Sequence, residues 1–283
     1  MKNSDELKDY FKDNPYLIAL DLDGTLLNKE GKISSKSKEY IKELQSYGNK
    51  IVLSSGRSDT NLLFFHKQLN LNTPLISYNG AKISFPKTRK KDIAYTFDEK
   101  IIKEFLSHYQ ETSFINIFGE DDSNAFFLKE YKLFEDFFAS GNKTIIYGSF
   151  LENVKNNLFS LIVQSSDTSN NDEMDKFLNS IHKDYHLRFW YDFPVFGEFY
   201  QDGVNKGNSL KKVASYLKIK KENIIAFGDG NNDLEMLKFS HYPFAMKNGS
   251  SLLHKEIKKV TKYTNDEDGV VYSLQELFSS LSS

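Results

Sequence analysis

Two apolar segments far apart in the chain both stop abruptly at aspartates. Residues 17–26 read LIALDLDGTL, and residues 224–237 read IIAFGDGNNDLEML. In an open parallel sheet, ligands bind just beyond the carboxyl ends of the strands, so the two segments predict several carboxylates around one site. Gathered carboxylates repel one another unless a cation or protons relieve the repulsion. The pattern therefore predicts a parallel α/β fold with a site for a hard divalent metal.

Two further apolar runs have the same design, IVLSS at 51–55 and PLISYNG at 74–80. Each ends in small or polar residues, as strands that are buried on both faces do. The segments between the first three runs, 34–48 and 58–70, have apolar residues at helical spacing. The order strand, helix, strand, helix, strand is typical of a parallel α/β layout.

The pattern of apolar and polar residues changes after about residue 83. Short apolar runs alternate there with loops rich in Gly, Asn, Asp and Ser. Helical stretches intervene near 98–110, 129–139 and 171–182. The parallel texture returns after about residue 200, and a chain of 283 residues is long for one core. We therefore expect a Rossmann-like core split into residues 1–82 and 196–283, which encloses an inserted α+β cap of residues 83–195.

Composition excludes several classes of protein. Cysteine is absent, so disulfides and thiolate metal sites are excluded. The formal net charge of −2 gives no general reason to expect nucleic acid or an anionic membrane as a partner. No segment is long and apolar enough to span a bilayer, and the polar N-terminus lacks the order of a secretory signal. We expect a cytoplasmic protein, a monomer or weak dimer, that binds neither nucleic acid nor a membrane.

The first aspartate pair has a chemical and a structural interpretation. Asp21 and Asp23 are two residues apart at a strand end, so side-chain alternation would direct both to one side. Gly24 permits a tight turn, and Thr25 can cap it. An isolated DLDGT fits an Asx turn equally well. A calcium loop at 229–234 is disfavoured, because the segment lacks the glycine and the glutamate that an EF-hand needs at its sixth and twelfth positions.

Complementary groups follow other strands. Ser54, Ser55, Gly56 and Arg57 lie between a strand and a helix, where hydroxyls and free backbone N–H groups form an anion site. The same residues also occur in ordinary helix caps. Lys206 stands at a helix start, where its charge opposes the macrodipole, and a residue placed against local preference hints at function. A solvated lysine is the structural alternative. The sequence lacks GxxxxGK[ST], which excludes a nucleotide-binding P-loop.

Taken together, these pieces resemble the haloacid-dehalogenase superfamily of phosphatases, and within it the Cof-like group, with a type IIB cap inserted after the third strand. The four motifs are DLDGT with Asp21 and Asp23, LSSGR with Ser55, GVNKG with Lys206, and GDGNND with Asp229 and Asp233. YNGA at 78–81, FAMKNG at 244–249 and NDEDGV at 265–270 are similar to stretches of the same group. The chain departs from the group in a serine for the usual threonine of motif two, and in Lys247, where a small residue is usual.

The resemblance implies phosphoryl transfer through an aspartyl-phosphate. Asp21 would be the nucleophile. Asp23 would be the general acid for the leaving alcohol and then the base that activates water. Mg²⁺ would bind Asp21, the backbone carbonyl of Asp23 and Asp229.

The resemblance also implies a set of binding and supporting residues. Those expected to hold the phosphoryl group or orient the substrate are Ser55, Gly56, Lys206, Asn79 and Asn232. Asn232 is also a candidate helix cap. Asp233 would position Lys206 or a metal-bound water. Arg57 is also expected to act through the groups that contact the substrate or the metal, and not by direct contact.

The leading hypothesis is a Mg²⁺-dependent phosphatase that acts on a phosphorylated small molecule, a sugar phosphate above all. A hexose phosphomutase of the same superfamily is the nearest alternative, and a non-catalytic phosphometabolite-binding protein is another. The sequence disfavours the latter, because a binder needs no Asp23. Cap residues would set the choice of substrate. Trp190, Tyr191 and Asp192 lie near the return to the core, and burial is the expected environment of Trp190.

Overall fold

The chain forms two compact units, which we call the core and the cap. The core comprises Met1–Ile93 and Asn205–Ser283, and the cap comprises Ala94–Val204. Both boundaries lie later in the chain than those expected after residues 82 and 195. The computed structural model describes residues 11, 14–132, 135, 143–190 and 193–281.

Strand pairing explains both shifts of the boundaries. β4 (Lys82–Ser84) pairs antiparallel with β3 (Leu75–Ser77), so the segment just past residue 82 belongs to the core. β11 (Phe196–Gln201) pairs antiparallel with β10 (Tyr185–Phe189) and β9 (Ser160–Gln164), so the segment past residue 195 belongs to the cap. Hydrophobic periodicity gives each strand but not its partner, which is why the sequence placed the boundaries early.

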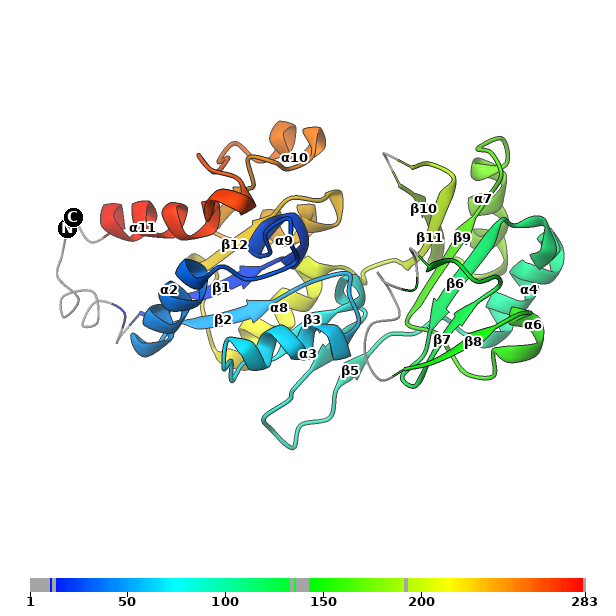
Figure 1. The fold of residues 1–283 in the computed structure, drawn as a ribbon, viewed down its shortest axis with the longest axis horizontal. Coiled ribbons are helices and arrows are strands. Elements are labelled where there is room, and N and C mark those ends of the chain that lie inside the picture. Colours follow the sequence, from blue (N-terminus) through cyan, green and yellow to red (C-terminus); the bar gives the residue numbers. More distant parts are fainter. Residues whose placement is uncertain (1–10, 12–13, 133–134, 136–142, 191–192, 282–283) are drawn as a thin grey trace. The chain divides into compact units, whose positions relative to one another are not determined.

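The main sheet of the core is parallel, as the four apolar runs predicted. Its described strands stand in the order β13, β12, β1, β2, and each neighbouring pair is parallel (Figure 1). A parallel bridge from Ser54 to Ile76 connects β2 with β3. The bounds are β1 (Leu17–Leu20), β2 (Lys50–Leu53), β12 (Ile224–Gly228) and β13 (Tyr242–Ala245). β5 (Ile93–Ala94) pairs with β4 at the edge of the smaller sheet.

Helices cover both faces of this sheet. Ile18 and Leu20 of β1 enter the hydrophobic cluster on one face, and Leu17 and Ala19 enter the cluster on the other. The first cluster includes residues of α2 (Ser35–Ser46), α3 (Asp59–Gln68) and α11 (Gly269–Leu281). The second includes residues of α8 (Lys206–Leu217), α9 (Leu234–Phe239) and α10 (Ser251–Glu256). Burial on both faces explains the continuous apolar runs and leaves polar residues for the loops at the strand ends.

The two helices expected at 34–48 and 58–70 are confirmed as α2 and α3. Each begins after a serine N-cap, and that serine accepts a hydrogen bond from a backbone N–H three residues on. Ser58 caps α3, so residues 54–57 form a short loop between β2 and this helix. The loop lies at the carboxyl edge of the parallel sheet, beside the segment that follows β1.

The cap is an α+β unit around one sheet. Its described strands stand in the order β10, β11, β9, β6, β7, β8, and the remaining bounds are β6 (Asn116–Glu120), β7 (Asn124–Phe127) and β8 (Thr144–Tyr147). One face packs on α4 (Glu99–Tyr109), α6 (Phe150–Asn153) and α7 (Asn171–Ile181) (Figure 1). Of the expected cap helices, α4 and α7 are confirmed. The third, at 129–139, includes 133–134 and 136–139, which lie outside the described residues. Among the described helices, none is long and apolar enough to cross a membrane.

Candidate active site

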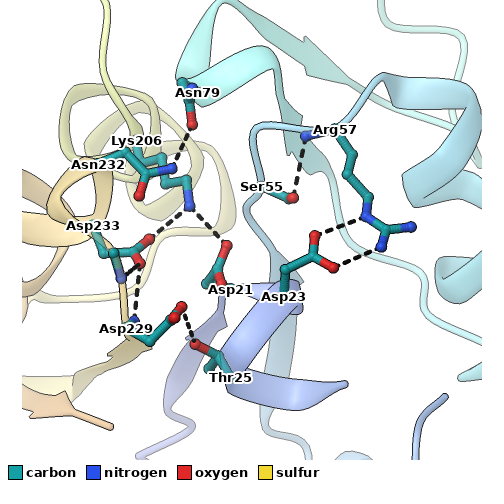
Figure 2. Close-up of polar contacts among 11 residues, drawn as sticks. Asp21, Asp23, Thr25, Ser55, Arg57, Asn79, Lys206, Asp229, Asn232 and Asp233 are labelled. Atoms are coloured by element: carbon teal, nitrogen blue, oxygen red, sulfur yellow. Dashed lines mark hydrogen bonds and ion pairs between the residues drawn. The ribbon is translucent and has the colours of Figure 1, made fainter. Parts of the chain in front are cut away.

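Two loops at the carboxyl edge of the core sheet bring carboxylates to one lysine at the start of a helix (Figure 2). Asp21 follows β1, Asp233 lies in the turn between β12 and α9, and Lys206 is the first residue of α8. The Lys206 ammonium donates hydrogen bonds to Asp21 Oδ1 at 2.7 Å and to Asp233 Oδ1 at 2.6 Å. All three side chains are buried, and Lys206 is 0% exposed. Residues separated by up to 212 positions in the sequence therefore form one closed network.

Helix packing places Lys206 in this network. Asn205 caps α8, because its side-chain oxygen accepts a hydrogen bond from the Asn208 N–H at 2.8 Å. A Cβ at Gly207 would collide with the backbone of Glu235 in α9. α8 and α9 therefore approach closely at this glycine, and Asp233 immediately precedes α9. The contact fixes the distance between the lysine and Asp233.

The electrostatics of the network show an excess of negative charge. Burial, with the nearby Asp233 and Asp229 carboxylates, raises the pKa of Asp21 well above its ordinary value, although Lys206 opposes the shift. Burial alone would lower the pKa of Lys206, but Asp21 and Asp233 together raise it, so the ammonium keeps its charge. Burial and Asp233 raise the pKa of Asp229 to about 6. With all three carboxylates ionised, one ammonium leaves two negative charges, which one divalent cation would neutralise.

Asp229 is held against the first aspartate loop by two neighbours. Thr25 Oγ1 donates a hydrogen bond to Asp229 Oδ1 at 3.2 Å. Gly24 has a φ of 71°, and a Cβ there would collide with the Asp229 carboxylate. A side chain at position 24 would thus be strained by the backbone and blocked by Asp229. The DLDGT segment therefore contributes two acids, and its Gly24 and Thr25 also pack against the Asp229 side chain.

The acidic cluster fits a metal ion. Asp21, Asp229 and Asp233 each offer one carboxylate oxygen, and these atoms lie within 4.8 Å of one another. Asp233 is already occupied, because its Oδ1 accepts from Lys206 and its Oδ2 accepts from the N–H groups of Asp229 and Gly230, both at 3.0 Å. Asp21 and Asp229 therefore have carboxylate oxygens that a metal could take, whereas the Asp233 carboxylate orders the loop that carries Asp229. An all-oxygen donor set suits Mg²⁺.

Asp23 lies in a different environment. Its side chain is 44% exposed and forms a bidentate ion pair with Arg57, whose Nε and Nη2 donate at 2.7 and 2.6 Å. Asp21 and Asp23 point away from each other, toward Lys206 and toward Arg57 (Figure 2). The Asp23 side chain is not among the clustered carboxylates of the described residues, so of the expected metal contacts only its backbone carbonyl is open to it.

The loop after β2 contributes a buried hydroxyl. Ser55 is 2% exposed, and its Oγ accepts a hydrogen bond from the Arg57 N–H at 3.2 Å. A Cβ at Gly56 would lie 3.1 Å from Asn79 Oδ1. The loop therefore packs tightly against the turn at 78–80, and the Ser55 hydroxyl faces the space between the two aspartates (Figure 2).

The two asparagines of the expected site contact each other. Asn232 Nδ2 donates a hydrogen bond to Asn79 Oδ1 at 2.8 Å. Asn79 adopts a left-handed conformation with a φ of 53°, and Tyr78 before it has a φ of 50°. Each such residue costs about 1–3 kcal/mol in backbone strain, which persists only where surrounding contacts enforce it. Asn232 lies in a short helical turn ahead of α9 and is not its N-cap; that position belongs to Asp233.

Two polar residues around this site, Asn248 and Ser250, were not assigned a role from the sequence. Asn248 Nδ2 donates to the Gly24 carbonyl at 2.7 Å, and the Ser250 N–H donates to the Asp229 carbonyl at 2.8 Å. Together with Thr25 they tie the segment after β13 to both aspartate loops. The available sequence signal is FAMKNG, which is similar to a stretch of the Cof-like group, contains Asn248 and ends one residue before Ser250. Lys247 is exposed and lies 4.0 Å from Glu267, an ion pair at the surface.

The cap residues singled out from the sequence are only partly described. Trp190 is half-buried, and its ring lies 5.1 Å from that of Phe196. Tyr191 and Asp192 lie outside the described residues.

Most of the chain matches one protein family, the haloacid dehalogenase-like hydrolases, over residues 18–274. The chain is also 31% identical over 268 residues to the 5-amino-6-(5-phospho-D-ribitylamino)uracil phosphatase YitU of Bacillus subtilis. That alignment covers 94% of this chain and 98% of the relative.

Solved structures have the same fold. A haloacid dehalogenase-like hydrolase from Bacteroides thetaiotaomicron superposes with a TM-score of 0.79 at 26% identity, covering 93% of this chain and 100% of that one. A subclass IIB sugar phosphatase superposes with a TM-score of 0.76 at 21% identity, covering 93% and 98%. At that identity the second likeness concerns the fold alone.

Proposed function

The chain belongs to the haloacid dehalogenase-like hydrolases and is a phosphatase of that family, and from this premise we propose that it hydrolyses small phosphate monoesters through a phosphorylated Asp21. One observation carries the proposal. The fully buried Lys206 bridges Asp21 and Asp233 beside Asp229, while Asp23 stands at the exposed side of the same loop. Such an arrangement separates a nucleophile from a proton carrier, which a two-step hydrolysis needs.

Asp21 attacks the phosphorus, and the bond from phosphorus to the ester oxygen breaks. Lys206 supplies fixed positive charge beside the attacking carboxylate. The Ser55 hydroxyl, with backbone N–H groups of its loop at Gly56, holds oxygens of the transferring group. Asn232 and Asn79 orient the substrate or the loops around it. These groups are in place before the substrate arrives, so little reorganisation accompanies the reaction.

Asp21, Asp229 and the carbonyl of Asp23 would hold Mg²⁺, which neutralises the substrate phosphate and the attacking carboxylate when it is bound. Thr25 and Asp233 keep Asp229 in place for this role. The two uncompensated negative charges of the network favour a divalent cation over a monovalent one.

Asp23 donates a proton to the leaving alcohol and later takes one from the water that attacks the phosphorylated Asp21. The first transfer needs a protonated Asp23, and the second restores it, so the proton balance closes over one cycle. Arg57 holds the Asp23 carboxylate through two hydrogen bonds and thereby defines where it stands between steps. Substrate binding would have to loosen at least one of these bonds.

Sugar phosphates are our leading substrate class. A second candidate is 5-amino-6-(5-phospho-D-ribitylamino)uracil, because a relative with 31% identity over nearly its whole length is named for that substrate. Phosphate release from both classes, with and without Mg²⁺, separates the two. Isomerisation primed by a bisphosphorylated sugar, with little free phosphate, would instead indicate a phosphomutase. We also propose a cytoplasmic monomer or weak dimer.

The Asp21→Asn variant tests the proposal. It keeps the shape of the side chain and removes the nucleophile, so we expect Mg²⁺-dependent phosphate release to fall at least about 1,000-fold. Asp59→Asn is the matched control, because Asp59 accepts from Lys82 at 2.8 Å in the same unit but outside the site. Near-normal turnover by a folded Asp21→Asn protein would remove the nucleophile assignment.

A further inference from the structure

Three consecutive residues of the turn at 78–80 have positive φ angles. Tyr78 has a φ of 50°, Asn79 a φ of 53° and Gly80 a φ of 101°. Residues other than glycine avoid this region, and two in succession are held there only by their surroundings. The contacts of the turn therefore show which neighbouring segments keep it in this conformation.

One side of the turn supports the loop after β2. The Tyr78 N–H donates to the Arg57 carbonyl at 3.0 Å, and the Asn79 N–H donates to the Ser55 carbonyl at 3.1 Å. In this left-handed turn, two successive N–H groups thus donate to the same loop. Position 56 carries glycine where the Asn79 side chain packs against it.

The other side of the turn contacts the start of α8. A Cβ at Gly80 would collide with the Asn205 carbonyl and lie 2.9 Å from the backbone nitrogen of Lys206. Ser209 is buried, and its Oγ donates to the Gly80 carbonyl at 2.8 Å. Lys206 and Ser209 are three residues apart and thus share one face of the helix. The backbone of the turn is therefore packed directly beneath the lysine of the site.

The place of Lys206 in the chain makes such support necessary. The chain returns from the cap to the core between Val204 and Asn205, so Lys206 is only the second residue of the returning segment. Only Asn205 of the core segment precedes α8, so contacts with other parts of the core must hold the start of this helix in place. Gly80 and Ser209 supply an anchor from within the core.

The turn also reaches the loop that carries Asp229 and Asp233. Asn79 Oδ1 accepts from Asn232 Nδ2 at 2.8 Å, as Figure 2 shows. Ser55, Lys206 and Asn232 come from three separate segments of the chain. The backbone of Ser55 and the side chain of Asn232 bond to Asn79, and the backbone of Lys206 packs against Gly80.

We propose that the Tyr78–Gly80 turn is a positioning element that fixes Lys206 and Asn232 relative to the Ser55 loop. Gly80 and Ser209 are the positioning residues for Lys206, and Asn79 is the positioning residue for Asn232. The kinetic part of the test rests on the proposed phosphatase function, and the crystallographic part does not.

Gly80→Ala is the decisive variant, and Gly31→Ala is its control. Gly31 also has a positive φ, 70°, and among the described atoms nothing lies within 4 Å of a Cβ placed there, so alanine at 31 tests a residue with positive φ without the collision. We expect kcat of Gly80→Ala to fall about 100-fold, because small misplacements of catalytic groups have effects of that size. KM should change much less, since the Lys206 charge acts mainly in the transition state. Gly31→Ala should keep the wild-type kcat.

Crystal structures of the same variants provide a readout independent of activity. The contacts from Lys206 to Asp21 and Asp233, 2.7 and 2.6 Å in the native chain, should lengthen in Gly80→Ala and persist in Gly31→Ala. If the native chain releases no phosphate, the proposed function fails and this comparison still decides the present inference. Unchanged contacts, or equal kcat in the two variants, would overturn it.

Ser209→Ala covers the case in which Gly80→Ala does not fold. It removes only the hydrogen bond to the Gly80 carbonyl, and we expect about a 10-fold lower kcat with a similar KM. Ser215→Ala is the control on the same helix, because Ser215 bonds the Lys211 carbonyl at the exposed face. Restored activity in Ser209→Thr would support positioning by the hydroxyl. Equal kcat values for Ser209→Ala and Ser215→Ala would contradict it.

Discussion

The loop that follows β1 carries Asp21 on its buried side and Asp23 on its exposed side, and the two sides differ in charge balance. On the buried side, Asp21 shares one lysine with Asp233 and lies beside Asp229, which leaves uncompensated negative charge. On the exposed side, Asp23 is matched by a single arginine in a two-pronged ion pair. Two aspartates only two residues apart thus differ in exposure, partner and charge balance.

The difference teaches which side depends on a cation. We propose that a divalent ion balances the charge of the buried side, whereas the exposed side is neutral as it stands. Buried charges interact strongly because the local dielectric is low, and exposed pairs are screened by water and salt. Changes on the buried side should therefore have large effects on catalysis and stability, and a change of the arginine that pairs with Asp23 on the exposed side should have smaller ones.

The largest effect is expected for Lys206→Met. Removing one preorganised charge contact lowers kcat by about 100- to 1,000-fold, and the carboxylates that remain buried and unpaired lower stability by roughly 3–5 kcal/mol. The measurements are steady-state kinetics and urea unfolding. Lys82→Met is the matched control, since Lys82 is also a buried lysine paired with a carboxylate in the core, but its partner is Asp59 and not a carboxylate of the site. Similar kcat losses in both variants would contradict a specific role for Lys206.

An intermediate effect is expected for Asp229→Asn, through the metal. Loss of a charged ligand should weaken Mg²⁺ binding at least about 100-fold, as measured by calorimetric titration. Binding to the native chain should also weaken as the pH falls below about 6, because Asp229 then takes up a proton that the metal must displace. Unchanged affinity between pH 8 and pH 5 would contradict the assignment of Asp229 as a ligand.

The same aspartate predicts how stability depends on pH in metal-free buffer. Its pKa of about 6 in the folded chain lies above the ordinary 3.8, so the folded state binds more protons than the unfolded state between these values. Stability should therefore rise as the pH falls through 6, and Asp21 acts in the same direction. In Asp229→Asn this component disappears, so that the free energy of unfolding at pH 8 increases, on the order of 2–3 kcal/mol. A metal-free variant less stable than the native chain at pH 8 would refute this.

The smallest effect is expected for Arg57→Lys on the exposed side. Lysine keeps the charge but cannot donate two parallel hydrogen bonds to Asp23. We expect kcat to fall about 10-fold, because Asp23 loses its defined position, and stability to change by less than about 1 kcal/mol. Chemical denaturation beside steady-state kinetics checks both values. A loss of kcat as large as that of Lys206→Met would erase the distinction between the two sides.

The sequence predicted the convergence of acids because parallel strands end at one edge of a sheet. Asp21 and Asp229 follow adjacent strands, so their proximity required only the strand assignment. The position of the Lys206 side chain, between Asp21 and Asp233, could not be derived in this way. It depends on how α8 packs at Gly207 and Gly80, which are contacts between backbones distant in sequence.

The pairing of Asp23 with Arg57 was also beyond the sequence. Alternation along a strand predicted that Asp21 and Asp23 share one side, but β1 ends at Leu20 and a turn begins at Leu22, so the two side chains diverge. The cap boundaries failed for a related reason, because antiparallel partners such as β3 and β4 are set by tertiary packing. Local periodicity identifies elements, and non-local contacts decide which elements meet.

The most direct test of the central claim is to find where the phosphoryl group resides during turnover. A reaction with a substrate identified by phosphate release is quenched with acid in the steady state, and the peptides are mapped by mass spectrometry. The account predicts one phosphoryl group on the peptide that contains Asp21, on the Asp21 side chain and absent from Asp21→Asn. A phosphoryl group on any other residue, or rapid turnover with no phosphorylated peptide, would contradict it.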